Sequence, residues 1–296
     1  MSITTRKGQI SKVAVIGAAG RMGKWFVRYH ANRAAVVSAF DIRTPGGFDA
    51  FSNVRVATQL DRCIEDSDAI VICAPVTAMP ELIRECAMLA KKGAVLAEIS
   101  SVKRQSHLAL KKIRGDIVPL CLHPMFGPAA GEADLKWILV PVRNGQTEIQ
   151  VARSLYPSMN IAQVNTWKDH DRAMGIILGL TYAVNLAFAD TISKSDLGLL
   201  KSLSGTTFAV QSMLAESIVA EEPGLIGAVV SSNPETLKYV KQFSMAFDEL
   251  KRHVGDSDQI VSRATALNKR LSESHSLEKS YELLYKVVSL LKQAKN

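Results

Sequence analysis

Two short segments, far apart in the chain, carry the residue types best suited to chemistry. Leu122-His-Pro-Met-Phe-Gly-Pro128 presents a histidine, His123, at the end of an apolar run. Gly17-Ala-Ala-Gly20-Arg-Met-Gly23 is a glycine-rich turn that follows another apolar run. A histidine with an ordinary pKa of about 6.5 can take a proton from a hydroxyl group, and a glycine turn can hold a dinucleotide. Together they predict hydride transfer assisted by a base.

The spacing of the glycine turn suits a diphosphate. Glycine allows a tight turn, a close approach of backbone to phosphate, and close packing of a helix whose N-terminal N–H groups face the anion. The G-x-x-G-x-x-G spacing is weak evidence by itself, and the turn could serve only the fold. Asp41 ends the next apolar run, where a carboxylate accepts hydrogen bonds from ribose hydroxyls, so NAD is favoured. Arg43 could instead hold a 2′-phosphate, which keeps NADP open.

A third apolar run ends in Cys73-Ala-Pro-Val, where a loop would pass under the cofactor, although Pro75 could merely end a strand. The predicted cofactor-binding residues are therefore Gly17, Ala18, Ala19, Gly20, Arg21, Met22, Asp41, Ala74 and Pro75.

The first half of the chain alternates apolar runs with segments of helical period. Continuous hydrophobicity is typical of strands covered on both faces, so the alternation predicts a parallel sheet with helices on either side. We expect an α/β Rossmann-type dinucleotide-binding domain over residues 1–166. The expected strands are 13–16, 35–40, 69–74, 94–99, 117–122 and 138–142, and the expected helices are 22–31, 78–91 and 105–113.

Residues 167–296 predict an all-α domain. Its apolar stretch, 173–189, is hydrophobic nearly all round, which indicates burial in a core or against a second chain, so we expect a homodimer through this domain. The stretch is shorter than the roughly 20 residues that span a bilayer, so no membrane contact is expected. The expected helices are 171–192, 197–220, 223–230, 234–253 and 256–291, the last with a break near 272–276.

Composition narrows the class of function. The 296 residues are 47% hydrophobic, and the net charge of +8 comes from residues 1–164, which hold 21 Lys/Arg against 13 Asp/Glu. Without a basic run or an aromatic platform, this asymmetry favours small polyanions over nucleic acid. The four cysteines lack C-x-x-C spacing, so we expect reduced thiols and no metal site. The first dozen residues lack the apolar stretch of a signal peptide, which predicts a cytoplasmic protein that begins at Met1.

Several segments together resemble the prephenate and arogenate dehydrogenases of tyrosine biosynthesis, and Ser231-Ser-Asn-Pro234 is similar to archaeal-type members. The segment around His123 is the most specific. The other matching segments are Val15-Ile-Gly-Ala-Ala-Gly-Arg-Met-Gly23, Ile99-Ser-Ser-Val-Lys103 and Asp169-His-Asp-Arg-Ala-Met174.

The resemblance implies an NAD(P)-dependent oxidation of the ring alcohol of prephenate with loss of its ring carboxylate, giving 4-hydroxyphenylpyruvate. It implies that His123 deprotonates or polarises the ring hydroxyl and that Ser101 orients the hydroxyl, the histidine and the nicotinamide. His170 and Asp171 are expected to cap and orient the first helix of the second domain.

The chain departs from this family at two positions. Tyr182 stands where a second histidine is usual, and it could donate a hydrogen bond to a substrate carboxylate. The family's carboxylate-binding arginine is expected within residues 212–219, yet no arginine occurs between Arg172 and Arg252. Buried carboxylates need cationic partners, and Lys103, Arg104 and Arg172 are the candidates. The chain therefore binds prephenate through rearranged charges or acts on a related substrate such as arogenate.

Three other functions stay open. The glycine turn also resembles that of dihydrodipicolinate reductase, although the all-helical second half argues against that enzyme. A dehydrogenase of another hydroxy acid is a broader alternative, and its usual lysine has no clear counterpart here. A chain that binds a nicotinamide nucleotide without catalysis is the third, which retention of Ser101 and His123 disfavours.

Overall fold

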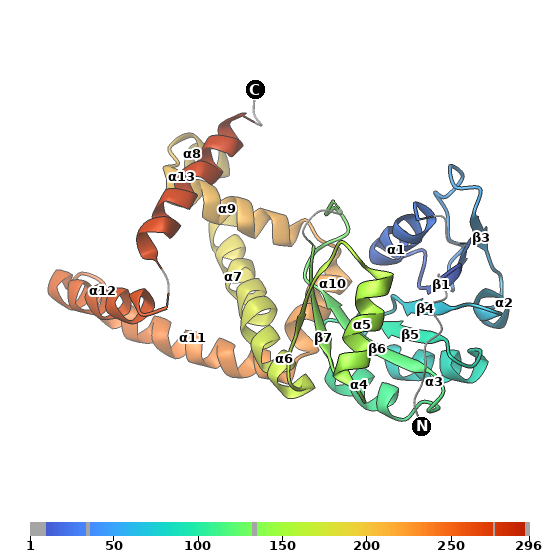
Figure 1. The fold of residues 1–296 in the computed structure, drawn as a ribbon. Coiled ribbons are helices and arrows are strands. Elements are labelled where there is room, and N and C mark those ends of the chain that lie inside the picture. Colours follow the sequence, from blue (N-terminus) through green and yellow to red (C-terminus); the bar gives the residue numbers. More distant parts are fainter. Residues whose placement is uncertain (1–9, 34–35, 132–134, 275, 294–296) are drawn as a thin grey trace. The chain divides into compact units, whose positions relative to one another are not determined.

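The computed structural model describes residues 10–33, 36–131, 135–274 and 276–293. The chain forms two compact units, Met1–Ala173 and Met174–Asn296 (Figure 1). The first unit is an α/β domain and the second is helical, which confirms the predicted fold class. The predicted division at 166/167 lies seven residues before the division between the units.

A single eight-stranded sheet organises the first unit, in the order β3-β2-β1-β4-β5-β6-β7-β8. Strands β1 to β6 are parallel, as predicted, whereas β7 is antiparallel to β6. Residues 125–135 separate these two strands, fewer than the dozen or more that a parallel crossover needs. The expectation of a wholly parallel sheet is therefore wrong at this edge. The strands are β1 (Lys12–Ile16), β2 (Val36–Phe40), β3 (Val54–Val56), β4 (Ala69–Ile72), β5 (Val95–Glu98), β6 (Val118–Pro124), β7 (Lys136–Val140) and β8 (Asn160–Gln163).

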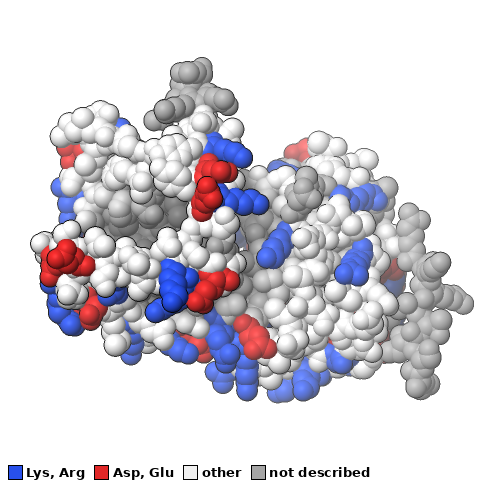
Figure 2. Space-filling model, turned by 60° about the vertical axis from the view of Figure 1, so that its left-hand side comes forward, with Lys and Arg blue, Asp and Glu red and all other residues white. Residues whose placement is uncertain are grey.

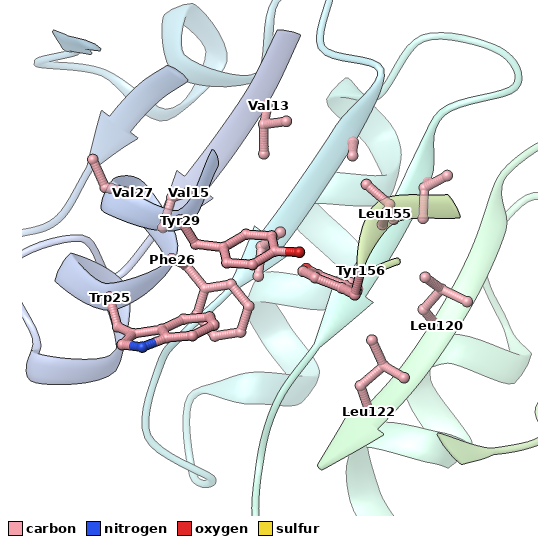
Figure 3. Packing of buried hydrophobic residues seen from close by; sticks show 14 of the residues in the cluster. Val13, Val15, Trp25, Phe26, Val27, Tyr29, Leu120, Leu122, Leu155 and Tyr156 are labelled. Atoms are coloured by element: carbon pink, nitrogen blue, oxygen red, sulfur yellow. The ribbon is translucent and has the colours of Figure 1, made fainter. Parts of the chain in front are cut away.

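Helices cover both faces of this sheet, each over its own apolar cluster. One cluster includes α1 and α5, and its aromatic rings pack closely, with Trp25 stacked on Tyr29 at 5.1 Å between centroids (Figure 3). The other includes α2, α3 and α4. The helices are α1 (Arg21–Ala31), α2 (Leu60–Ile64), α3 (Met79–Leu89), α4 (Arg104–Lys111), α5 (Gly145–Leu155) and α6 (Trp167–Met174).

In the second unit every described element is a helix. The predicted helix over 197–220 is two helices, because residues 203–205 break it. A π-helix, η1 (Gly175–Leu180), continues α6 into α7, and the side chains of Glu235 and Thr236 lie directly against Gly175 and Gly179. The others are α7 (Thr181–Ser193), α8 (Leu197–Ser202), α9 (Thr206–Val219), α10 (Pro223–Ser231), α11 (Pro234–Arg252), α12 (Ser257–Ser272) and α13 (Leu277–Gln293).

The apolar stretch 173–189 is poorly covered by its own chain. It belongs to a continuous helix, Trp167–Ser193, which by length and composition alone could cross a membrane, and 17% of its most apolar window is buried. Ile177 is half exposed. The expectation that this stretch is buried within its own chain is therefore wrong. The alternative, burial against a second chain, stays a prediction.

Candidate active site

Several of the predicted site residues in the first unit lie where parallel strands end, at the carboxyl edge of the sheet. Gly17 follows β1, Asp41 follows β2, and Ser101 follows β5, while His123 is near the end of β6. Strands β1 and β4 are neighbours although they are not consecutive in the chain. Ligands of open α/β sheets bind at this kind of switch point, at the carboxyl edge.

The glycine turn has the backbone that a diphosphate requires. Gly17 has φ +84°, and a Cβ there would overlap the carbonyl oxygen of Cys73. A Cβ at Gly23 would overlap the carbonyl oxygen of Gly17. Gly20 is the N-cap of α1, which has neither a side-chain cap nor an acidic residue in its first turn. The first N–H groups of α1 are thus available to an anion.

Asp41 is fixed against this turn. One carboxylate oxygen accepts a hydrogen bond from Ala19 N at 3.0 Å, and the other accepts one from Arg43 N at 3.0 Å. The carboxylate side chain is 9% exposed, whereas the Arg43 side chain is 75% exposed with its Nε 4.0 Å from Asp41. The acidic group is therefore held beside the turn, as a ribose contact needs, and the guanidinium is drawn towards it.

The remaining residues that were predicted to bind the cofactor present either backbone or an exposed side chain. The side chain of Ala18 is buried in the core, so only its backbone can face a ligand, and Arg21 is exposed. After β4, Ala74 is half-buried and Pro75 is exposed, with its carbonyl accepting a hydrogen bond from Ala78 N at the start of α3.

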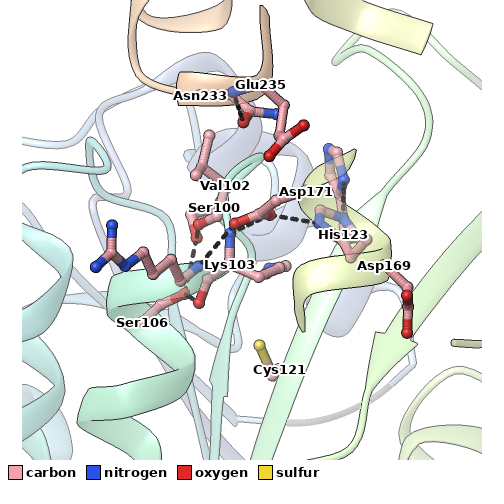
Figure 4. A network of polar contacts seen from close by, with 12 residues as sticks. Ser100, Val102, Lys103, Ser106, Cys121, His123, Asp169, Asp171, Asn233 and Glu235 are labelled. Atoms are coloured by element: carbon pink, nitrogen blue, oxygen red, sulfur yellow. Dashed lines mark hydrogen bonds and ion pairs between the residues drawn. The ribbon is translucent and has the colours of Figure 1, made fainter. Parts of the chain in front are cut away.

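His123 belongs to a buried line of polar side chains. Its Nδ1 lies 2.9 Å from Nε2 of His170, and Nδ1 of His170 lies 2.8 Å from Oδ1 of Asp171 (Figure 4). Both imidazoles are buried. Burial lowers the pKa of His123 well below its usual value, assisted by the positive charge of Lys103. Burial also lowers the pKa of His170, although Asp171 opposes this. Both rings are therefore neutral at pH 7.

Asp171 caps a helix other than its own. Its two oxygens accept hydrogen bonds from the backbone N–H groups of Lys103, at 2.8 Å, and Arg104, at 3.0 Å, where α4 begins. The start of α6 is capped instead by Thr166 and Asp169, whose side chains are hydrogen-bonded to each other at 2.7 Å. The expectation that Asp171 caps the helix in which it lies is corrected by this tertiary contact with α4.

The residues predicted for the site do not include His170 and Asp171. An adjacent His-Asp pair at a helix start indicates a histidine oriented by a carboxylate. The pair alone does not indicate which other side chain that histidine contacts. The distance to His123 arises from the fold, since 47 residues separate the two histidines.

Lys103 has a different partner from the expected one. Its side chain is fully buried, its Nζ lies 2.6 Å from Oε1 of Glu98, and it also donates to the carbonyl of Leu122. The other Glu98 oxygen accepts hydrogen bonds from Ser100 N and Oγ, at 2.9 and 2.5 Å. The ammonium is thus neutralised inside the chain, where it cannot also serve a substrate carboxylate. Ser101, next to this cluster, is half-buried.

The two other predicted substrate residues differ in setting. In the second unit, the Tyr182 hydroxyl donates to Oε1 of Glu221 at 3.1 Å. Burial, together with Glu221, raises the pKa of Tyr182 to about 12. The proton that was predicted for a substrate carboxylate is therefore engaged with Glu221. Arg172 lies on α6 and Arg104 lies at the start of α4, and both side chains are exposed.

Cysteines and surface charge give no second site within the described part of the chain. The four thiols are free, and burial raises the pKa of each. Within the described ranges no group of three His, Cys, Asp or Glu side chains could hold a metal ion. On the face shown in Figure 2, Lys and Arg are interspersed with Asp and Glu rather than gathered in a stripe.

Two family models match this chain in succession. Residues 50–162 match the nucleotide-binding domain of prephenate dehydrogenase, and residues 166–265 match its dimerization domain. The first match begins after the glycine turn.

Two curated relatives are distant from this chain and longer than it. The chain is 20% identical over 256 residues to a probable arogenate/prephenate dehydrogenase of Methanocaldococcus jannaschii, covering 83% of this chain and 57% of that protein. It is 21% identical to the T-protein of Enterobacter agglomerans, covering 81% of this chain and 62% of that protein. The chain thus spans about 60% of the length of these relatives.

Solved structures share the fold. A prephenate dehydrogenase from Aquifex aeolicus, in complex with hydroxyphenyl propionate and NAD+, has a TM-score of 0.69 at 17% identity, covering 91% of this chain and all of that chain. A Synechocystis arogenate dehydrogenase has a TM-score of 0.63 at 15% identity, covering 88% of this chain and 99% of that one.

Proposed function

Because this chain belongs to the prephenate dehydrogenase family, we propose that it catalyses the NAD(P)-dependent oxidative decarboxylation of prephenate or its close relative arogenate. The observation that carries the proposal is the position of His123 at the carboxyl edge, with its Nδ1 engaged by His170. Its Nε2 has no hydrogen-bond partner within the described residues. A ring fixed in this way offers one nitrogen to a substrate hydroxyl.

The glycine turn and Asp41 fit a dinucleotide. The turn has no room for side chains at Gly17 or Gly23, and the first turn of α1 offers uncapped N–H groups. We propose that these N–H groups bind the diphosphate and that Asp41 binds the adenosine ribose, with Ala74 and Pro75 beneath the cofactor. Bound there, a nicotinamide would accept the hydride from the carbinol carbon. NAD is favoured over NADP because Asp41 is ordered beside the turn.

Proton transfer is the part that His123 performs. Its Nε2 takes the proton of the ring hydroxyl as hydride leaves the same carbon, which gives a carbonyl. Loss of carbon dioxide then pushes the electrons of the broken C–C bond into the ring, and the oxygen takes back a proton to become a phenol. The protein has to hold the proton only briefly, so a base of lowered pKa suffices. Ser101, after β5, is proposed to orient the hydroxyl.

Substrate carboxylates need cations, and the first unit leaves two exposed arginines in the segments that carry Ser101 and His170. Lys103 is paired with Glu98, whereas Arg104 and Arg172 are exposed. The backbone N–H of Arg104 is bound by Asp171, and Arg172 follows Asp171 directly. We propose that Arg172 binds a substrate carboxylate, with Arg104 as a second cation. A substrate with an amino group in its side chain, such as arogenate, needs one positive partner fewer.

Turnover by the purified full chain tests the proposal. Prephenate or arogenate is mixed with NAD or NADP, and reduced nicotinamide is followed by absorbance. His123→Asn should keep cofactor affinity but lower kcat by about 10²-fold or more, the worth of a general base. His253→Asn, at the end of α11, is the control and should keep full activity. Cofactor binding without turnover of either substrate would instead identify a non-catalytic nucleotide-binding protein.

We propose a homodimer through the second unit. The match to a dimerization domain comes with large exposed side chains on α11, including Met245 at 72% and Phe247 at 56%, and α12 has no buried residue. A second copy would remove this apolar surface from water. Sedimentation of the full chain should show a dimer, and Phe247→Glu should shift it towards monomer, whereas Lys241→Glu on the same helix should not. A wild-type monomer at micromolar concentration would contradict the proposal.

A further inference from the structure

The line from Asp171 through His170 to His123 has a direction that follows from hydrogen-bond chemistry. Both Asp171 oxygens accept backbone N–H groups, so the carboxylate acts as an acceptor towards His170 as well. His170 must then carry its proton on Nδ1. In a neutral ring this leaves a lone pair on Nε2, which can only accept.

The same logic fixes His123. Because Nε2 of His170 accepts, Nδ1 of His123 must donate across the 2.9 Å contact. A neutral His123 then has its lone pair on Nε2, the nitrogen without a partner within the described residues. The carboxylate thus selects the tautomer of a histidine that it does not touch.

We propose that His170 and Asp171 are positioning residues, which hold His123 in the tautomer whose Nε2 can receive a proton. This rests on the proposed function only where Nε2 serves as the base. When Nε2 gains the hydroxyl proton, the new positive charge on His123 faces the acceptor nitrogen of His170, and that ring is anchored to a carboxylate. The line therefore orients the base and stabilises its protonated form.

Asp171 also acts on the segment that carries Ser101. Its contacts with Lys103 N and Arg104 N fix the first turn of α4, whose N-cap lies two residues after the serine. Lys103 attaches the same segment to β6, because its ammonium binds the carbonyl of Leu122, the residue before His123. The Asp171 carboxylate thereby fixes both the tautomer of the His123 imidazole and the position of the segment that carries Ser101.

Among the described residues, Lys103 and Glu98 are two further charged groups that act on the imidazoles of this line. Lys103 and Glu98 form a closed pair between the start of α4 and β5, and Cys121 on β6 donates to Glu98 at 3.0 Å. The charges of the pair balance one another, and within the described ranges the carboxylate in contact with His170 is that of Asp171. The tautomer therefore depends on this contact rather than on the net charge of the surroundings.

Two amide variants separate positioning from simple loss of a side chain. His170→Gln can place its carbonyl oxygen where Nε2 stood, so it still accepts from His123. His170→Asn can place its amide where Nδ1 stood, so it still donates to Asp171 but does not reach His123. His107→Gln is the control, because that buried histidine on α4 contacts the Pro141 carbonyl instead of this line.

The direct measurement is ¹⁵N NMR of the His123 ring in the full chain, assigned through His123→Asn. We expect a protonated Nδ1 in wild type, His170→Gln and His107→Gln, and a shift of the proton towards Nε2 in His170→Asn. In parallel, kcat should fall by about 10²-fold or more in His170→Asn but by less than about tenfold in His170→Gln. Thermal unfolding confirms that each variant folds.

Wild-type His123 with its proton on Nε2 would overturn the proposal, as would equal loss of activity in the two amide variants with equal stability. The NMR result needs no turnover. If His123 carries its proton on Nδ1 but the protein oxidises neither prephenate nor arogenate, the proposed function is wrong and the positioning role still holds.

Discussion

Replacing Lys103 by methionine should destabilise the first unit strongly. Both side chains of the Lys103–Glu98 pair have 0% exposure, and their atoms lie 2.6 Å apart. Removing one partner leaves a carboxylate in the interior with only Ser100 and Cys121 as donors among the described residues. Breaking a buried pair in this way costs about 3–5 kcal/mol. For a unit of this size each kcal/mol lowers Tm by about 2–4 °C, so we expect a fall of roughly 6–20 °C.

The double variant Lys103→Met/Glu98→Gln provides the decisive comparison. It removes both charges, and the amide oxygen of the introduced glutamine can still accept from Ser100, so at least half of the lost stability should return. Urea unfolding followed by fluorescence gives the free energies. Lys194→Met breaks an exposed pair with Asp190 and should cost less than about 1 kcal/mol. A Lys103→Met cost below this, or a double variant as unstable as the sum of the singles, would refute the reasoning.

Three further changes test other parts of the structure. Gly17→Ala should abolish measurable NAD binding in a titration and lower Tm, because its Cβ overlaps backbone at φ +84°, whereas Gly46→Ala, with open space around it, should do neither. Burial lowers the pKa of His30 to about 3, so the unfolded chain binds a proton that the folded chain does not, and this histidine alone should cost about 1.4 kcal/mol of stability per pH unit below pH 6.5; His30→Leu should reduce the total slope, to which His123 and His170 also contribute, by that amount between urea unfolding free energies measured at pH 6.5 and pH 4.5. Tyr182→Phe should leave KM nearly unchanged, since its hydroxyl is bound to Glu221, and a tenfold rise, worth about 1.4 kcal/mol, would return this residue to the substrate site.

The inner strands, and the sheet edge that carries the candidate site residues, could be predicted from local pattern. Continuous apolar runs mark β1, β4, β5 and β6, because both faces of these strands are buried. By contrast, β3 and β8 have mainly polar or exposed residues at the edges of the sheet, so their sequences show no such run. The direction of β7 could not be predicted, because hydrophobicity does not encode strand direction.

Partners within the site could not be predicted, because they depend on tertiary distance. Lys103 follows Ser101 in a segment that suggests a ligand contact, yet its charge serves Glu98, five residues earlier. Asp171 has the residue type and position of a cap for its own helix, yet it caps α4, whose start lies 67 residues earlier. The chemistry of each side chain was evident in the sequence, but the atom that it meets was not.

The contact of Asp171 with α4 also bears on where the chain can be cut. A fragment that stops at residue 166, where strand patterns end, keeps the whole sheet and the glycine turn but loses α6. The backbone N–H groups of Lys103 and Arg104 at the start of α4 would lose their acceptor, Asp171. His123 would lose its contact with His170, which sets the nitrogen that carries the proton. Such a fragment would keep the glycine turn for nucleotide binding but would lose the groups that orient His123. A transfer of this domain to another protein therefore has to include the first turns of α6.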